Sequence, residues 1–460
     1  MNPRRSQESL PDLILFMIIS SLPFKEAMKL SLVSKRWESL CHKMTNIAFK
    51  ESEFVKFSDD EQTKSVARTS FVHYMLKWVA NFTGEEIKSF KLYLSKPVDI
   101  TTEVMSLINF AVSNHVKNLD LDFSYPSWIT KIEAETRVFQ FPGSFYNQMN
   151  LESLKLFACG FDPSRLAKTG SLKTLSFGWI QLRDIMSLIL KCPLLESLSI
   201  QNCWDVGLEK ITENNNRLRE LVFENCDFAV DYTTLDLPNI QIFKYSGRFH
   251  YFQFVGVNRV MKEAYLDFGV ETECQEGETG ELLCGLLYDL LSAKRLTICP
   301  FIIQLIQEYD PVRLQASMET RHLVMKTNML PHEFIGIKVM INSCPDLETL
   351  TLQMVDPRHV LPTDFEIEFD PETYWEYPIS HRCLKKTLKV VELRNFRGGL
   401  YEVYVLQFLI RCGLVLERVE LYLPIGVVES QRTSAFVVAE SLWKVTKIAS
   451  KNLKIYLHTG

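Results

Sequence analysis

A spaced leucine pattern runs through the middle of the chain and predicts a series of short parallel strands. In the pattern L-x-x-L-x-L, the apolar side chains of the strand point into a shared core. Copies begin at positions 151, 172, 195, 218 and 240, so successive intervals are 21, 23, 23 and 22 residues. Less regular copies lie around Leu119, Leu296, Leu323 and Leu350. Because one repeat cannot bury its apolar side alone, the pattern predicts a stacked solenoid with a concave parallel sheet.

Cysteine placement supports the same phase. Cys159, Cys203 and Cys226 each lie eight residues after the first Leu of their repeat. Leucine-rich repeats place a small buried side chain there, in the turn after the strand. We therefore interpret these thiols as structural groups and not as metal ligands or nucleophiles.

Residues between the leucines are predicted to face outward on the strands, where a target protein would bind. The candidate target-binding residues are Phe157, Trp179, Gln201 and Glu224. Aromatic anchors commonly dominate protein interfaces, which favours the first two. The alternative, that Phe157 and Trp179 pack against a neighbouring insertion, stays open at this point.

Three intervals depart from the repeat pattern. Residues 122–148 are rich in aromatic residues, among them Tyr125, Trp128, Phe139, Phe141, Phe145 and Tyr146, too many for a solvated loop. Residues 271–281 carry five Glu and precede an apolar helix signal at 282–291. Residues 364–376 alternate acidic and apolar positions, which predicts an edge strand with one acidic face. Each acidic segment is a candidate site for a basic partner or, alternatively, a solvated loop.

The first fifty residues predict three short helices. Ser9 can cap the first helix, with Pro11 and Asp12 in its first turn. Residues 13–19 are apolar nearly all round, so we expect this helix to be enclosed on most sides. The other predicted inward positions are Ala27, Met28 and Leu30 on a second helix and Val33, Trp37, Leu40 and Cys41 on a third. A unit of about 40 residues is only marginally stable alone, so we expect it to pack against another protein or against the rest of the chain.

This N-terminal stretch resembles an F-box of the plant type. The resemblance covers about residues 9–45 and rests on Leu10-Pro11-Asp12, Leu22-Pro23 and Val33-Ser34-Lys35-Arg36-Trp37. In that family the module docks on a Skp-type linker protein, which joins a cullin–RING ubiquitin ligase. Phe16 and Met17 depart from the family pattern, which often has a polar or acidic residue there. The resemblance implies docking and packing roles for Leu10, Pro11, Ile14, Leu22, Pro23, Val33 and Trp37.

The flanks of the repeat array also carry predicted elements. Residues 70–81 predict an amphipathic helix, and residues 87–94 a first strand. Beyond residue 378, strands are predicted at 388–393, 416–421 and 453–457 and helices at 402–411 and 428–449. Gly398-Gly399 fits a turn that needs positive φ. Residues 396–421 resemble the FBD unit found at the C-terminus of many plant F-box/leucine-rich-repeat proteins.

The expected fold class is therefore α/β. It comprises an N-terminal three-helix F-box, a leucine-rich-repeat solenoid (a parallel β-sheet horseshoe) and a C-terminal α/β FBD unit. The expected bounds are 6–50 for the F-box, 51–110 for a helix-strand entry, 111–377 for the repeats with insertions, and 378–460 for the FBD unit.

Charge and composition narrow the function classes. Residues 1–50 contain eight Lys or Arg and four Asp or Glu, so this part is +4 and the remainder is −9 within a net charge of −5. The basic residues 1–50 suit an acidic docking partner, and the acidic remainder of the chain argues against binding to nucleic acid. No apolar run approaches the ~20 residues of a membrane span, so no membrane is expected. Eleven scattered Cys without a C-x-x-C pair indicate reduced thiols in the cytosol or nucleus.

The sequence contains no Walker loop, H-E-x-x-H, G-x-S-x-G or dinucleotide fingerprint. We expect no catalytic residue, metal or cofactor. The leading hypothesis is a non-catalytic, substrate-recognition subunit of a Skp–cullin–F-box (SCF) E3 ubiquitin ligase, whose repeats hold a target protein. Two alternatives stay open: a sensor that binds a small ligand on its repeats, and a repeat scaffold without ligase function.

Overall fold

The structure is a computed structural model, and two compact units make up the chain. It describes residues 10–56, 58–125, 128, 138–147, 150–212, 217–256, 258–269, 276–306, 317–355, 369–376, 381–426, 428–445 and 448–459. The first unit is Met1–Leu208 with Asp227–Ala229, and the second is Glu209–Cys226 with Val230–Gly460. Within the described ranges, no helix is both long and apolar enough to cross a membrane.

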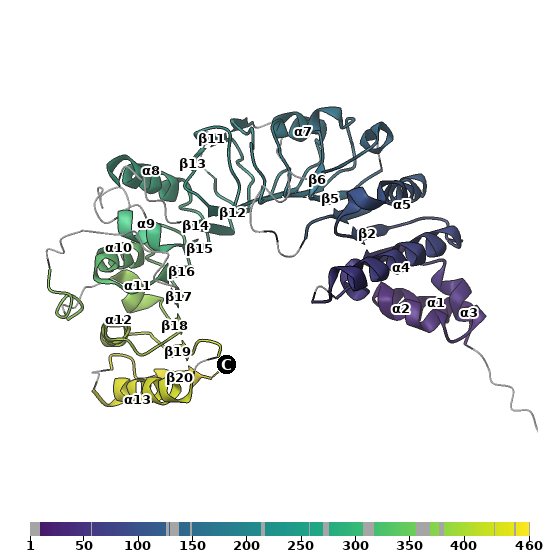
Figure 1. Cartoon of the computed structure of the whole chain (residues 1–460). Coiled ribbons are helices and arrows are strands. Elements are labelled where there is room, and N and C mark those ends of the chain that lie inside the picture. The colour runs from purple at the N-terminus through teal and green to yellow at the C-terminus, as the bar shows by residue number, and fades with distance from the viewer. Residues whose placement is uncertain are drawn as a thin grey trace, which may run out of the picture. The chain divides into compact units, whose positions relative to one another are not determined.

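Three short helices open the first unit, and alternating strands and helices follow (Figure 1). The α-helices are α1 (Asp12–Ser21), α2 (Phe24–Ser31), α3 (Lys35–Cys41), α4 (Glu61–Ala80), α5 (Thr101–Ser113) and α7 (Ile185–Lys191). The strands are β1 (Asn46–Lys50), β2 (Ser89–Tyr93), β3 (Asn118–Asp122), β4 (Phe139–Gln140), β5 (Ser153–Phe157), β6 (Cys159–Gly160), β7 (Thr174–Gly178) and β8 (Ser197–Gln201). Strands β1-β2-β3-β5-β7-β8 form a parallel sheet in that order.

The predicted repeat strands are confirmed, with the register that the leucine spacing implies. Leu154 of β5 pairs with Leu175 of β7, which pairs with Leu198 of β8, and all three are fully buried. The residues between them are only half-buried, so each strand has one core side and one open side. Alternation along each strand therefore builds one continuous core across the repeats.

A left-handed residue ends each of these strands. Ala158, Trp179 and Asn202 have φ of 56°, 55° and 51°, a conformation that is uncommon outside glycine. Each turn directs the following residue inward, and Cys159 and Cys203 are buried as predicted. The cysteine positions thus belong to the turn that closes the repeat.

The parallel sheet begins one strand earlier than predicted. The sequence placed the first strand at 87–94, where the structure has β2. Strand β1 precedes it and pairs with it in parallel, with Phe49 opposite Leu92. This strand was missed because it follows α3 closely and shows only one alternation, at Ile47 and Phe49. The three-helix module therefore continues directly into the sheet.

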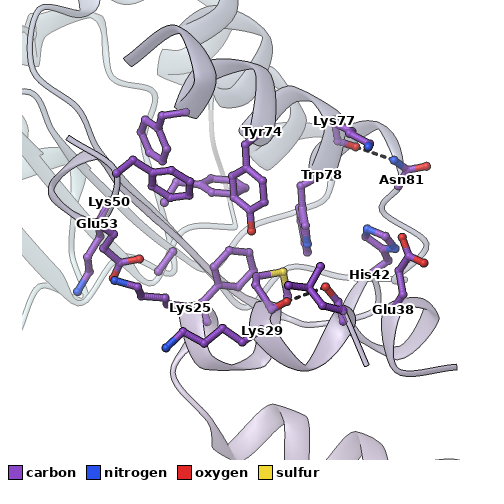
Figure 2. Close-up of a pocket in the computed structure, with 18 residues that line it drawn as sticks. Lys25, Lys29, Glu38, His42, Lys50, Glu53, Tyr74, Lys77, Trp78 and Asn81 are labelled. Carbon is purple, nitrogen blue, oxygen red and sulfur yellow. Dashed lines mark hydrogen bonds between the residues drawn. The ribbon is translucent and has the colours of Figure 1, made fainter. Parts of the chain in front are cut away.

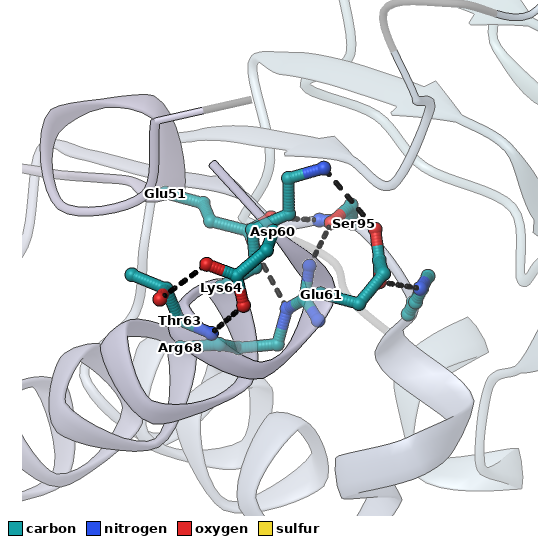
Figure 3. A network of polar contacts seen from close by, with 8 residues as sticks. Glu51, Asp60, Glu61, Thr63, Lys64, Arg68 and Ser95 are labelled. Atoms are coloured by element: carbon teal, nitrogen blue, oxygen red, sulfur yellow. Dashed lines mark hydrogen bonds and ion pairs between the residues drawn. The ribbon is translucent and has the colours of Figure 1, made fainter. Parts of the chain in front are cut away.

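A buried ion pair fixes β1 to α4 and β2 (Figure 3). The Glu51 carboxylate, in the 3-10 turn η1 (Glu51–Glu53), accepts hydrogen bonds from Arg68 Nε at 2.6 Å and from the Ser95 backbone N–H at 2.5 Å. Arg68 also donates to Ser95 Oγ at 2.9 Å. Removing one partner of such a pair would leave an uncompensated buried charge.

Helix α1 is less enclosed than the sequence predicted. Only Leu15 and Ile19 are buried, whereas Leu13 is 71% and Met17 64% exposed. The prediction was wrong because none of the described elements covers the opposite side of the helix. Pro11 is the N-cap residue and makes no side-chain cap. The predicted cap, residue 9, lies outside the described residues.

Helices α2 and α3 bury part of their predicted apolar positions. Ala27, Leu40 and Cys41 are buried, and Met28, Leu30 and Trp37 are half-buried. Val33 does not point inward, because α3 starts only at Lys35, after its N-cap Ser34, and Val33 is 67% exposed in the preceding turn. The module thus has a small core and a large open surface.

The aromatic interval is buried over its described part, residues 138–147, and is not a solvated loop there, as predicted. Phe139, Phe141, Phe145 and Tyr146 are buried. The rings of Phe141 and Phe145 stack at 4.0 Å, and Tyr146 stacks on Phe161 at 5.6 Å. These residues extend the core of the repeats.

The second unit contains further strands of the same kind. Its α-helices are α8 (Glu276–Asp289), α9 (Pro300–Leu305), α10 (Phe334–Ser343), α11 (Arg382–Lys386), α12 (Leu400–Cys412) and α13 (Glu429–Val445). Its parallel sheet runs in the order β10 (Glu220–Glu224), β12 (Ile242–Gly247), β14 (Glu263–Phe268), β15 (Arg295–Ile298), β16 (His322–Thr327), β17 (Thr349–Met354), β18 (Val390–Arg394), β19 (Arg418–Tyr422) and β20 (Lys454–His458). A small sheet, unpredicted, has the order β13 (Tyr251–Phe254), β11 (Tyr232–Leu235) and β9 (Lys210–Ile211).

The two acidic segments are described only in part. The apolar helix signal at 282–291 is confirmed as part of α8, while residues 271–275 lie outside the described residues. Residues 364–368, which hold most of the alternation behind the predicted edge strand, also lie outside, and the described remainder, 369–376, is a turn. The buried Trp375 explains the turn, because its ring packs on Phe334 of α10 at 5.2 Å.

The C-terminal strands and helices form where predicted. Gly398 has φ of 74°, as expected, but Gly399 is an extended N-cap with φ of −65°. The Glu402 carboxylate accepts hydrogen bonds from the backbone N–H groups of Arg397, Gly398 and Gly399, at 3.0, 2.9 and 3.3 Å. One carboxylate therefore accepts hydrogen bonds from three successive backbone N–H groups in the turn that starts α12.

Truncating the core side of one strand should destabilise the protein much more than truncating its open side. Leu198→Ala should lower the free energy of unfolding by about 2–5 kcal/mol, because it leaves a cavity in the shared core. Ser199→Ala, its neighbour on the open side, should change that free energy by no more than about 0.5 kcal/mol. Urea denaturation followed by circular dichroism measures both, and equal effects would contradict the assigned faces.

Glu333 should make stability fall as pH rises. It is fully buried and accepts hydrogen bonds from Thr327 Oγ1 and from the backbone N–H groups of Asn328 and Leu330. Burial raises its pKa from 4.5 to about 7. Its neutral form is thus favoured by folding, and that contribution is lost as pH rises from about 4.5 through about 7.

The matched variant is Glu333→Gln, which cannot ionise. The melting temperature of the parent minus that of the variant should decrease between pH 4.5 and pH 8. A difference independent of pH would show that the Glu333 carboxyl titrates normally.

Candidate docking surface, repeat face and junction pocket

The three N-terminal helices expose an unusual amount of apolar side chain. We call this set the docking surface: Leu10, Leu13, Ile14, Met17, Ile18, Leu32 and Val33. The most exposed member is Leu32, at 87%, in the turn between α2 and α3. Clustered exposed apolar residues of this kind mark interaction sites on folded proteins.

Arg36 holds the start of α1 against α3. Its guanidinium donates to Asp12 Oδ1 at 2.6 Å and to the Leu10 backbone carbonyl at 2.5 Å. The pair is exposed, so its contribution to stability is small. Its effect is to orient the first turn of α1, where the docking surface begins.

The predicted docking residues divide into two groups. Leu10, Pro11, Ile14, Pro23 and Val33 are exposed and available to a partner. Leu22 and Trp37 are half-buried, so they also serve packing within the module.

A pocket lies where α2, the end of α3, β1 and α4 meet (Figure 2). We call it the junction pocket, and its volume is about 480 Å³. Its aromatic lining centres on Phe24, whose ring lies 5.3 Å from Phe49 and 5.2 Å from Trp78, both edge-to-face. The remaining aromatic lining residues are Phe54, Phe71 and Tyr74.

Burial sets the protonation of the groups in and around this pocket. It raises the pKa of Tyr74 to about 12, so the hydroxyl is a hydrogen-bond donor at neutral pH. Burial also lowers the pKa of His42, against the opposing effect of Glu38. Behind the pocket, burial raises the pKa of Cys41 to about 11, and its thiol donates to the Ala27 carbonyl at 3.2 Å. Cys41 is thus an unreactive structural thiol.

The open side of the first sheet brings two of the predicted target-binding residues together. Phe157, Gly178 and Gln201 are in register as the last residues of β5, β7 and β8. A side chain at Gly178 would meet the ring of Phe157, since a Cβ there would lie 2.2 Å from Phe157 Cε1. The glycine therefore lets Phe157 lie across the strand end towards Gln201, and Lys155 Nζ lies 4.9 Å from the ring centroid.

The other two predicted target-binding residues are placed differently. Trp179 is half-buried in the turn after β7, and its ring lies 5.9 Å from that of Trp128 in the aromatic interval. Packing against an insertion, the alternative considered above, is thus part of its role. Glu224 is exposed at the end of β10 and belongs to the second unit.

The described residues include no group of three or more His, Cys, Asp or Glu side chains placed to hold a metal ion. Ten cysteines fall within the described part, and none of them forms a disulfide. Nine of them are buried.

Sequence reasoning missed the junction pocket. Phe71 and Trp78 lie in the amphipathic helix predicted at 70–81, but the sequence did not connect them with their partners Phe24 and Phe49. The signal present in the sequence was the alternation of Ile47 and Phe49, which marks a strand between two aromatic helices.

Two family models match the chain. The F-box domain matches residues 8–47, and the leucine-rich-repeat domain of the At1g61320/AtMIF1 type matches residues 79–421, more than half of the chain. Among Arabidopsis thaliana proteins, the F-box protein At3g62230 is 50% identical over 92% of both chains. The F-box/LRR-repeat protein At5g54820 is 43% identical over 95% of both. The chain belongs to the plant F-box/LRR proteins.

The two matched regions of this F-box/LRR protein correspond to particular helices and strands of the structure. The F-box match ends within β1, and the repeat match begins near the end of α4 and extends through β19. The repeat match therefore includes the whole segment, 396–421, that resembles an FBD unit. No separate FBD model is among these matches, so that unit stays a prediction.

Proposed function

We propose that this F-box/LRR protein is the substrate-recognition subunit of an SCF ubiquitin ligase. The observation that carries the proposal is an exposed apolar docking surface in the same compact unit as an open strand face. F-box/LRR proteins typically act as such receptors. The chain itself would be non-catalytic, and it would accelerate transfer by holding its target near the ubiquitin-charged enzyme.

The partner at the docking surface would be a Skp-type linker protein and, through it, a cullin–RING ligase. The proposed contacts are Leu10, Pro11, Ile14, Leu22, Pro23, Val33 and Trp37. Water-exposed apolar surface is unfavourable, and covering it contributes roughly 25 cal/mol per Å². Buried reduced thiols are typical of the cytosol and nucleus, where we place this assembly.

The target would bind at the open face of the repeats, with Phe157 and Gln201 as its first contacts. Trp179 would support them through Trp128. Glu224, in the second unit, would be a separate candidate contact. We retain the four expected domains, 6–50, 51–110, 111–377 and 378–460, as part of this proposal. The last would be an FBD unit that extends the repeat scaffold, as the parallel pairing of β18, β19 and β20 supports.

Docking should depend on the exposed side of α1. Ile14→Glu should weaken binding to a purified plant Skp-type linker by about 30-fold or more, the effect of losing a contact worth about 2 kcal/mol. Because Ile14 is 42% exposed, the variant should keep the parent's melting temperature. The matched control is Leu190→Glu, an exposed leucine on α7. Calorimetric titration of each variant with the linker gives the affinities.

Two outcomes separate the rival functions. A folded parent that does not bind the linker supports the scaffold without ligase function. Equal binding by the parent and Ile14→Glu would place docking elsewhere on the chain. Trp37→Ala is a less decisive variant, because its half-buried ring also packs inside the module.

Target binding should be separable from docking. The Ile14→Glu chain should retain targets without passing them to the ligase, so it is a suitable bait in plant cells. Adding Phe157→Ala and Gln201→Ala should reduce recovery of those targets by about 30-fold, since interface anchors contribute about 2 kcal/mol or more. Adding Leu190→Ala instead, at a residue away from the strand face, should not reduce the recovery of those targets.

The readout is quantitative mass spectrometry of the bait complexes, together with target half-life in cells that express the parent chain. True targets should turn over faster with the parent than with Ile14→Glu. If the same proteins are recovered whether or not Phe157 and Gln201 are present, the proposed repeat-face contacts are wrong.

A further inference from the structure

The junction pocket has the size and lining of a small-molecule site. Its volume of about 480 Å³ falls within the range of roughly 300–1,000 Å³ that ligand pockets occupy. All of its lining residues are described, and they come from α2, α3, β1, η1 and α4 with their adjoining turns. The pocket lies apart from Phe157 and Gln201, so it is not the proposed target site.

Aromatic rings form the apolar part of the pocket. Figure 2 shows Trp78 standing in the middle of the lining residues, with the hydroxyl of Tyr74 directed into the pocket beside it. The Phe24, Phe49 and Trp78 rings meet one another edge-to-face at 5.2 to 5.8 Å. Rings in this arrangement offer both faces and edges to a flat apolar group.

The pocket also contains a buried donor that the protein does not satisfy. Trp78 is 4% exposed, and its Nε1 has no acceptor among the described residues. Buried N–H groups nearly always have a partner, and leaving one unpaired costs about 1–3 kcal/mol. A ligand that brings an acceptor to this nitrogen would remove that penalty.

Positive charge surrounds the aromatic lining. Four lysines line the pocket, Lys25, Lys29, Lys50 and Lys77, against two carboxylates, Glu38 and Glu53. Lys29 pairs with Glu26 at 2.8 Å, while the other three have no carboxylate within ion-pair distance among the described residues. Lys50 Nζ lies 5.7 Å from the centroid of the Tyr93 ring. Ammonium groups without a carboxylate partner beside an apolar lining favour an organic anion over a neutral or cationic ligand.

We propose that the junction pocket binds a small organic anion with a flat, apolar body. The body lies among Phe24, Phe49 and Trp78, an acceptor atom meets Trp78 Nε1, and the negative charge lies near Lys25 and Lys50. The inference does not depend on ubiquitin ligation, because the site is complete within this chain. It differs from a sensor site on the repeats, since none of the candidate repeat residues lines it.

The test is a titration of the purified full chain with naphthalene-2-carboxylate and with its neutral counterpart, naphthalene-2-carboxamide. The carboxylate should bind saturably and at least about fivefold more tightly, since a charged hydrogen bond is stronger than a neutral one. The indole N–H resonance of Trp78 should shift on binding, and its loss in Trp78→Phe assigns it. Equal affinity for the two compounds, or no saturable binding, would overturn the proposal.

Two variants and a control localise the binding. Ala48→Leu narrows the pocket, and the double change Lys25→Gln with Lys50→Gln removes two positive charges that have no carboxylate partner. Each should weaken carboxylate binding by about fivefold or more while the carboxamide is unaffected by the lysine changes. Lys35→Gln, an exposed lysine of α3 outside the pocket, is the matched control. Unchanged affinity in both pocket variants would place the binding elsewhere and refute the assignment.

Discussion

Aromatic packing among α2, β1 and α4 is the interaction on which the first unit depends. The three N-terminal helices bury few side chains of their own, and a module of about 40 residues is marginal without support. Phe24 supplies that support by packing on Phe49 and Trp78. Because β1 also pairs with β2 and carries the Glu51–Arg68 ion pair at its end, the helices are tied to the sheet.

This attachment explains why α1 has two unlike sides. Leu15 and Ile19 complete the small core, while Leu13 and Met17 on the other side face water. Arg36 and the α2–α3 turn hold the exposed residues in defined places. An adaptor needs this combination, since a partner can be oriented only by a surface that is itself held.

The repeat strands and most helices were predictable, but the candidate sites were predictable only in part. Leucine spacing located β5, β7 and β8 because core burial on one side forces a two-residue alternation. The resemblance selected docking residues, of which Leu10, Ile14 and Val33 proved exposed. Trp179 could not be assigned between target binding and packing, because its neighbour Trp128 lies 51 positions earlier in the sequence. The junction pocket could not be predicted, because its lining residues share no periodic spacing in the sequence.

The sequence by itself determined the order of modules and the side of each strand that is buried. Both are local properties, since they follow from the spacing of apolar residues within one repeat and from short motifs. Only the tertiary structure decided that β1 begins the sheet, that no described element covers one side of α1, and that Trp78 Nε1 has no acceptor among the described residues. These features depend on which distant elements meet, and contacts between residues far apart in the chain leave no periodic trace in it.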